Sequence, residues 1–484
     1  MRLVAWLLAA LVAVILQFAP RAFGQSLPDL GGTGDATLSP MVERRIGEDI
    51  MREIRYRDPS YVDDPEVTDY LQSLGSRLVQ ANPAARQEFE FFGVRDHTVN
   101  AFALPGGFVG VHTGLITTAE TESELASVLG HEIAHVTQRH IARMLGQQQQ
   151  MQVPMLAALA AAVLLGRSRP DLAMGAAAAA QAGTVQASLA YSRDFEREAD
   201  RIGLQTLEDA GFDARAMASF FEKMQKSTRI SDDGSVPGYL RSHPVTVERI
   251  ADVQNKAAAL PYRQHRDSLE FNLVRAKLRA EAGDPRDTLA AIQSALREKR
   301  YVNEVAARYG HAIALMRNNQ VRDAQAEVGR LRAMKVESPM IETLDARVKF
   351  AAGDKPGAIA VLSAAQKRYP YSRAIAYSDV AALQDSGDNA AALEALKEPM
   401  RLYPRDARLH SLQAKTYAAL GKRLLQHQSQ AEAYALQGSL PAAIEQYQLA
   451  RSAGDGDFYQ LSVVDARLKD LRSQYAAEMK DAKR

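Results

Sequence analysis

Residues 125–143 read LASVLGHEIAHVTQRHIAR, and the pattern H-E-I-A-H at positions 131–135 decides how the rest of the chain is interpreted. Apolar residues recur before and after the pattern at helical spacing, so the stretch is predicted to be one helix. Residues four apart on a helix point in similar directions, and two imidazoles so placed can bind one metal ion. Glu132 points about 100° away from His131, within reach of a water molecule beside that ion. A five-residue pattern can also arise by chance. The alternative is a buried helix in which the two histidines have no catalytic role.

Length and composition narrow the classes of protein to consider. A chain of 484 residues exceeds one hydrophobic core, so two or three domains are expected. The net charge of +1 argues against nucleic acid as a partner. The chain has no cysteine. Any metal ligands must therefore be histidines and carboxylates, and no disulfide stabilises the fold.

The beginning of the chain has the features of an export signal. Arg2 precedes an almost wholly apolar run over residues 3–18, and the triplet AFG at 22–24 matches a small-x-small cleavage site. The run is short for a membrane span of roughly 20 residues, so a cleaved signal over 1–24 is favoured over a membrane anchor. Without a cysteine near this site, a lipid-anchored lipoprotein is excluded. Residues 25–40 are predicted to be a linker, and the mature protein is expected to be exported and soluble.

A short strand before the motif helix is a candidate for binding substrate. Phe108, Val109, Gly110 and Val111 follow a glycine-rich turn and are predicted to be a strand. In zinc peptidases an edge strand beside the motif helix can pair with an extended peptide. The alternative is an ordinary hairpin, and His112 is interpreted as structural. Further elements are predicted upstream, two helices at 41–56 and 65–79 and a strand at 89–94.

An acidic cluster about 60 residues after the motif offers a third ligand. In the segment 191–200, YSRDFEREAD, Glu196 and Asp200 share one helix face, whereas Glu198 points about 200° away from Glu196 and is predicted to be solvated. Glu196 is therefore the predicted metal ligand. Asp200 is the predicted acceptor for the N–H of a ligand histidine. The alternative is a charged surface helix.

His140 is not predicted to be a ligand. It follows His131 by nine residues, which places it about 180° round an uninterrupted helix and facing away. The metzincin pattern is excluded as well, because Gln138 and Ile141 stand where that pattern requires glycine and histidine.

Three separated motifs together resemble the HtpX and CAAX prenyl endopeptidase family of zinc metallopeptidases. They lie at 100–115, 131–135 and 192–200. The resemblance implies a mainly α, zincin-type domain with a small β-sheet over 41–262. It also implies one Zn²⁺ per chain, bound by His131, His135 and Glu196, with Glu132 as the catalytic residue. A prenylated substrate is not expected, because this chain lacks the spanning helices of the integral-membrane members.

His243 lies in the segment Ser242-His243-Pro244, which resembles a further segment of the same family, as does Glu248-Arg249-Ile250 downstream. Two functional roles for His243 are open. It can donate to the oxyanion of the tetrahedral intermediate. Alternatively, it fills the open position of zinc and keeps the enzyme inactive until it is displaced. A capping or core histidine is the third interpretation.

Two apolar, alanine-rich runs separate the motif helix from the acidic cluster. They span 153–166 and 173–187, and each is shorter than a membrane-spanning helix. A buried helical hairpin, a flap over the active site and a surface in peripheral contact with a membrane all fit this pattern.

Residues 265–484 have the periodicity of paired helices. Gly353, Gly387 and Gly421 are spaced by 34 residues, which is the signature of tetratricopeptide repeats. We expect four to six repeats that form an α-helical solenoid with a concave binding surface. The next step, from Gly421 to Gly438, is only 17 residues, and it is interpreted as one added helix. The alternative is an unrelated helical bundle.

An exported peptidase of this family with such repeats resembles a group of periplasmic quality-control proteases. The resemblance implies a periplasmic location and hydrolysis of unfolded or misassembled outer-membrane proteins. It also implies repeats that engage the outer-membrane assembly machinery. A latched or inactive peptidase that acts mainly as a chaperone or scaffold is the alternative. The presence of His131, Glu132, His135 and Glu196 together favours an enzyme.

Overall fold

The computed structural model describes residues 38–147, 193–230 and 238–481. It divides into two compact units, the first ending at Ser268 and the second beginning at Leu269, with Asp64–Asp69 grouped with the second. The predicted signal, most of the predicted linker and the apolar runs at 153–187 lie outside the described residues.

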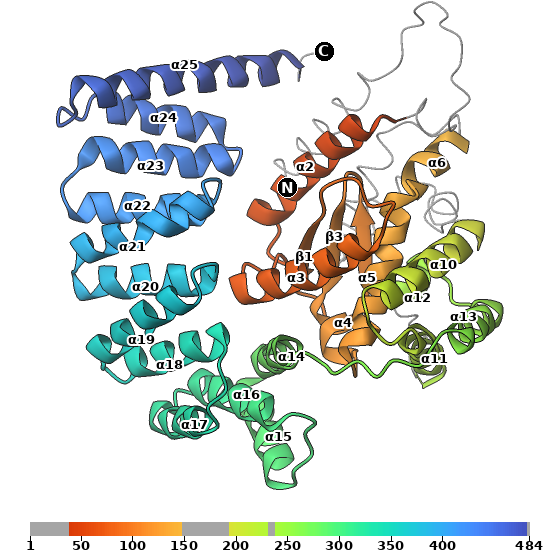
Figure 1. Cartoon of the computed structure of the whole chain (residues 1–484). Helices are drawn as coiled ribbons and strands as arrows, with labels where there is room; N and C mark the ends of the chain where they lie inside the picture. Colours follow the sequence, from red (N-terminus) through yellow and green to blue (C-terminus); the bar gives the residue numbers. More distant parts are fainter. Residues whose placement is uncertain (1–37, 148–192, 231–237, 482–484) are drawn as a thin grey trace, which may run out of the picture. The chain divides into compact units, whose positions relative to one another are not determined.

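A three-stranded sheet organises the first unit (Figure 1). Its strands are β1 (Glu90–Val94), β2 (Ala101–Leu104) and β3 (Phe108–His112). β3 pairs parallel with β1 and antiparallel with β2, which makes it the central strand. The prediction that residues 108–111 form an edge strand is therefore wrong. Among the described strands, β2 has an unpaired edge on the side away from β3. The local sequence pattern predicted that these residues form a strand. It could not predict that β1 pairs with the other side of β3.

Helices cover both faces of the sheet. They are α2 (Pro40–Arg57), which begins at the cap Ser39, and α3 (Pro65–Ala81). Met51 of α2 packs against Phe92 on one face. Phe91 points to the opposite face, where its ring lies against Gly75 of α3 and leaves no room for a side chain there.

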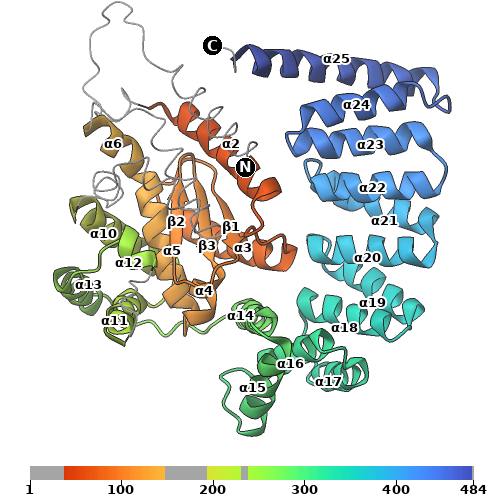
Figure 2. The same cartoon turned by 180° about the vertical axis from the view of Figure 1, so that it is seen from behind.

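The motif helix, α5 (Glu122–Thr137), runs beside β2 (Figure 2). Thr121 caps it, and α10 packs along it at the close approach of Gly130 and Gly203. The remaining described helices of this unit are α4 (Thr113–Thr118), α6 (His140–Gln147), α10 (Arg193–Asp209), α11 (Arg215–Ile230), α12 (Gly238–Ser242) and α13 (Val247–Ala259). Across the described parts of both units, every helix is too short or too polar to cross a membrane.

The second unit consists of helices joined pairwise by short turns (Figure 1). They are α14 (Leu269–Glu281), α15 (Pro285–Arg297), α16 (Glu304–Arg317), α17 (Val321–Ala333), α18 (Pro339–Ala351), α19 (Lys355–Arg368), α20 (Arg373–Ser386), α21 (Asn389–Leu402), α22 (Ala407–Ala419), α23 (Arg423–Leu436), α24 (Leu440–Arg451) and α25 (Phe458–Asp481). Three of these turns contain a glycine in the left-handed region, which commonly ends a helix: φ is 87° at Gly353, 86° at Gly387 and 71° at Gly421. This is the predicted tetratricopeptide architecture.

The predicted irregularity after Gly421 is wrong. The turn inside the next pair is at Gly454, with φ of 80°, so the series continues after 33 residues. Gly438 instead lies between two pairs, and α23 is the second helix of an ordinary repeat. The sequence spacing misled because both kinds of turn use glycine.

Candidate metal centre

Four buried side chains converge in the first unit. They are His131, His135, Glu196 and His243, and one ligand atom from each lies within 4.8 Å of the others. The Nε2 atoms of His131 and His135 are 3.0 Å apart. Nδ1 of His243 is 3.0 Å from Oε1 of Glu196 and 3.3 Å from Nε2 of His131. Nitrogen and oxygen atoms aimed at one point in a buried site are the donor set that Zn²⁺ accepts.

Two helices supply the three ligands predicted from the sequence. His131 and His135 lie one turn apart on α5, and Glu196 lies in the first turns of α10. Oε1 of Glu196 is 3.4 Å from His135 Nε2, and its Oε2 is 3.5 Å from His131 Nε2. The close packing of α5 on α10 therefore builds the site.

Arg249 is a functional residue to which the sequence analysis gave no role. Its guanidinium makes two hydrogen bonds of 2.7 Å to Asp200 and lies 2.8 Å from Oε2 of Glu196. Asp200 in turn lies 3.0 Å from Nδ1 of His131, as predicted for the acceptor behind a ligand histidine. A signal was available, because two carboxylates on one buried helix face require a nearby cation.

His140 lies against the site, and the prediction that it faces away is wrong. α5 ends before it, and Arg139 takes a φ of 52°, so a new helix starts at His140. Nδ1 of His140 is 2.8 Å from Nδ1 of His135. Glu198 was predicted to be solvated, but its Oε2 is 3.2 Å from His140 Nε2 and 2.8 Å from Arg143.

Burial and pairing set the protonation of the ligands. Burial holds the pKa of His135 well below its usual range, so this imidazole is neutral. Burial also opposes the charge on His131, but hydrogen bonds with two buried carboxylates outweigh it and raise the pKa to about 9. For Glu196, burial is outweighed by His243 and the other histidines, and the pKa lies well below its usual range.

Glu132 has the environment of a proton-transferring group. Burial raises the pKa of its carboxyl, and the nearby His243 and His131 offset this only in part. Its Oε1 is 3.4 Å from Nε2 of His243. A carboxyl with a raised pKa is suited to accept a proton and pass it on near neutral pH.

Two further aromatic rings near the site have contrasting roles. Tyr239, which the sequence analysis missed, is fully buried and stacks on His243 with ring centroids 5.0 Å apart. No local pattern distinguishes it from an ordinary core tyrosine. His112 stays outside the group of four; its Nδ1 lies 3.2 Å from Oγ1 of Thr98 at the end of β3, which agrees with a structural role.

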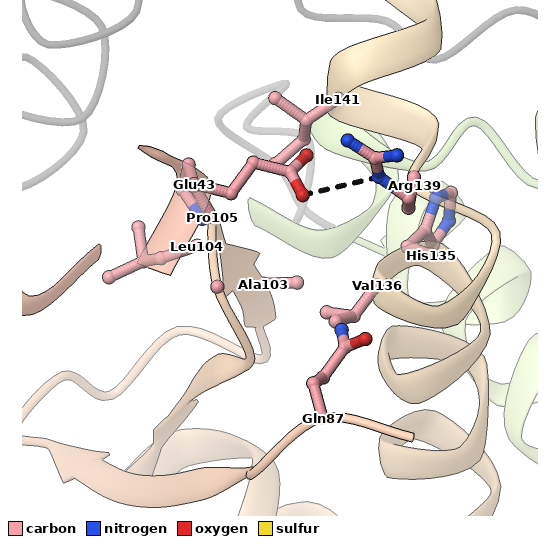
Figure 3. Close-up of a pocket in the computed structure, with 10 residues that line it drawn as sticks. Glu43, Gln87, Ala103, Leu104, Pro105, His135, Val136, Arg139 and Ile141 are labelled. Carbon is pink, nitrogen blue, oxygen red and sulfur yellow. Dashed lines mark hydrogen bonds and ion pairs between the residues drawn. The ribbon is translucent and has the colours of Figure 1, made fainter. Parts of the chain in front are cut away.

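A small pocket lined in part by His135 adjoins the candidate metal centre (Figure 3). His135 and Val136 of α5 form one wall, and Ala103 of β2 lies opposite. Arg139 closes one side through its ion pair with Glu43, with Nε and Oε2 3.3 Å apart (Figure 3). The other lining residues are Gln87, Leu104, Pro105, Gly106 and Ile141.

A helix with two candidate ligand histidines and a glutamate, a third candidate ligand on the adjacent helix and a small sheet beside them are the features of a zincin-type metallopeptidase. The chain belongs to peptidase family M48, whose pattern it matches over residues 65–257. It is therefore a zinc metalloendopeptidase.

Known proteases are similar to this chain over part or most of its length. The "Beta-barrel assembly-enhancing protease" of Escherichia coli is 32% identical over 480 residues, which cover 97% of this chain and 96% of that one. The "Putative beta-barrel assembly-enhancing protease" of Vibrio cholerae is 38% identical over 294 residues, 60% of each chain. The "Mitochondrial metalloendopeptidase OMA1" of Arabidopsis thaliana is 31% identical over 219 residues, 44% of this chain and 41% of that one.

Proposed function

We propose that this chain is a periplasmic endopeptidase that hydrolyses unfolded or misassembled outer-membrane proteins, and that its repeats recruit these clients or their assembly machinery. One observation carries the proposal. The match to a protease named for β-barrel assembly extends over both units rather than over the peptidase alone. The apolar run and cleavage triplet at the start of the sequence support export.

In the proposed reaction, each residue has a defined task. His131, His135 and Glu196 would hold Zn²⁺, which supplies a Lewis acid that polarises the peptide carbonyl and acidifies water. Glu132 accepts the proton of the attacking water and delivers it to the leaving amine. Burial raises the pKa of Glu132, and a carboxyl with a raised pKa accepts a proton more readily than an exposed one.

The substrate is proposed to lie along β2, in place of the β3 path expected from the sequence. β2 has an unpaired edge among the described strands and runs beside α5. Glu132 lies on α5, the helix that packs against β2, so a peptide bound along β2 would lie near the carboxyl of Glu132. An extended peptide on β2 would pass the metal ligands and direct a side chain into the pocket of Figure 3.

A latched peptidase is the second candidate, and the position of His243 favours it. Its Nδ1 lies with the three ligand atoms, where it would fill the position that a catalytic zinc keeps open. A role in stabilising the oxyanion instead requires His243 to leave this position. His243→Ala separates the two roles: higher peptidase activity supports the latch, and a strong loss supports transition-state stabilisation. Unchanged activity contradicts both.

The test of the enzymatic function compares mature protein with Glu132→Gln. Both are incubated with an unfolded outer-membrane β-barrel protein, with and without a zinc chelator, and fragments are followed by electrophoresis. We expect cleavage only by the unmodified chain and only without chelator. Equal cleavage by Glu132→Gln would refute the assigned base. If neither protein cleaves while His243→Ala does, the enzyme is latched. No cleavage by any of the three refutes the peptidase role and leaves the scaffold.

A further inference from the structure

Each ligand histidine on α5 has a different partner behind it. Nδ1 of His131 faces the carboxylate of Asp200, the usual kind of outer partner. Nδ1 of His135 instead faces another imidazole, that of His140, at 2.8 Å. Nothing in the reaction assigned above uses His140, although it is fully buried.

We propose that His140, Glu198 and Arg143 form a hydrogen-bonded chain that fixes His135 as a metal ligand. The direction of its hydrogen bonds follows from the ligand atom. Nε2 of His135 faces the other ligand atoms, so Nδ1 must carry the ring proton and donate it. Nδ1 of His140 then accepts, and Nε2 of His140 carries the proton and donates to Oε2 of Glu198 at 3.2 Å.

Arg143 completes the chain by donating to the same oxygen of Glu198 at 2.8 Å. This contact pairs the carboxylate of Glu198 with a cation. The negative charge thus stands one imidazole away from the ligand. Through His140 it orients the His135 ring and strengthens the ring nitrogen as a donor to the metal.

Packing fixes the position of the intermediate ring. His140 stacks on Phe195 with centroids 4.6 Å apart and an interplanar angle of 13°. The guanidinium of Arg143 lies over the same phenyl ring, 4.6 Å from its centroid. Phe195 therefore holds two members of the chain, and it directly precedes the third ligand on α10.

The backbone break between α5 and α6 makes the contact possible. A continuous helix would carry His140 to the far side, whereas the left-handed conformation of Arg139 turns the chain back. The side chain of Arg139 bonds to the carbonyl of Leu38 and pairs with Glu43. The strained residue is thus held from outside the helix, as expected where a φ above zero serves a site.

The inference rests on zinc as the cofactor but on no particular substrate, so metal affinity tests it. The mature chain carrying Glu132→Gln, which prevents self-digestion, is titrated with Zn²⁺ against a chromogenic chelator. His140→Phe keeps the stacking but removes the acceptor, and it should raise the zinc Kd by about 10- to 100-fold. His140→Gln can accept and donate along the same path and should recover most of this loss. Asp194→Ala changes an exposed acidic residue of α10, the helix that carries Glu198; it is the matched control and should leave the Kd unchanged.

The absorption spectrum of the Co²⁺-substituted protein gives a second readout, which a role in packing alone would not change. We expect altered bands in His140→Phe and near-normal bands in His140→Gln. Zinc affinity within twofold of the parent, with unchanged Co²⁺ bands, would overturn the proposal. Should His140→Phe fail to fold, Glu198→Ala replaces it, with weaker binding expected and parental affinity again contradicting the proposal. A parent that binds no zinc would overturn the cofactor as well, so the two failures are distinguishable.

Discussion

Gly203→Ala tests the close packing that assembles the metal centre. A Cβ at Gly203 would lie 3.0 Å from the backbone nitrogen of His131 and 3.1 Å from its Cα. These are backbone atoms of α5, which cannot move aside as a flexible side chain would. In α17, by contrast, nothing lies within 4 Å of a Cβ at Gly329. The two positions therefore make a matched pair.

The change in stability should have opposite signs at the two positions. An alanine in place of glycine inside an exposed helix stabilises by about 1 kcal/mol. Overpacking of a close contact costs about 1–3 kcal/mol, so Gly203→Ala should be destabilising by a net ~1 kcal/mol. A change of 1 kcal/mol alters local opening about fivefold, and hydrogen exchange with mass spectrometry resolves α10 and α17 separately. We expect faster exchange in α10 of Gly203→Ala and slower exchange in α17 of Gly329→Ala.

Slower exchange in both variants would refute the close approach of α5 and α10.

Gly203→Ala should also affect metal binding. Glu196 lies two turns before Gly203 on the same face of α10, so a displaced α10 separates Glu196 from His131. Zinc affinity should fall in Gly203→Ala and stay unchanged in Gly329→Ala.

Three further perturbations follow from described contacts. Chelation of zinc should reduce exchange protection in α5 and α10 but not in the repeats, because all ligands lie in the first unit; equal loss in α17 would contradict this. Glu122 accepts hydrogen bonds from the Tyr70 hydroxyl and from Ser268, so Glu122→Ala should be destabilising by about 2–3 kcal/mol in urea unfolding; an unchanged free energy of unfolding would contradict this. Burial raises the pKa of Glu327, but hydrogen bonds from three basic side chains lower it to about 2, below the ordinary 4.5. This stabilisation is present above pH 4.5 and is lost as the pH falls towards 2. The loss of stability in Glu327→Gln, measured by urea unfolding, should therefore disappear over that interval. A loss that does not depend on pH would refute the pairing.

Local spacing predicted the parts of the site that local geometry determines. Two histidines four apart on a helix share a face wherever the helix packs, and the turn glycines of the repeats recur because each pair of helices is alike. Glu196 and Asp200 were predicted by the same reasoning. Their partner Arg249 is distant in sequence, and only the folded chain shows which buried carboxylates it neutralises.

Tertiary contacts decided two of the elements that were predicted wrongly, the end of α5 and the place of β3. Gln138 and Arg139 include no glycine or proline, so the sequence does not mark the end of α5 there. The break is stabilised by contacts of Arg139 with Leu38 and Glu43, about 100 residues earlier. The place of β3 in the sheet likewise depends on β1, which is not adjacent to it along the chain.

The contacts around His243 indicate which part of the chain moves if it acts as a latch. Arg249 binds two buried carboxylates, so a displacement of α13 would disturb the third ligand. Residues 239–244 contact the rest of the unit through the hydrogen bond from Tyr239 N–H to the carbonyl of Val99, the hydrogen bond from Arg249 to the carbonyl of Pro244, and the contact of His243 with Glu196. Opening is therefore expected within residues 239–244.

Tyr239→Leu tests this latch through the ring that stacks on His243. An aromatic pair contributes about 0.5–1.5 kcal/mol, so its loss should shift the latch towards the open state by about 2- to 13-fold. Peptide cleavage should rise by up to this factor, whereas a transition-state role for His243 predicts a fall. Tyr239→Phe keeps the ring and removes a hydroxyl that has no partner among the described residues, so it should match the parent. In a His243→Ala background the effect of Tyr239→Leu should vanish, because no latch remains to be weakened; a persistent effect would show that Tyr239 acts independently of His243.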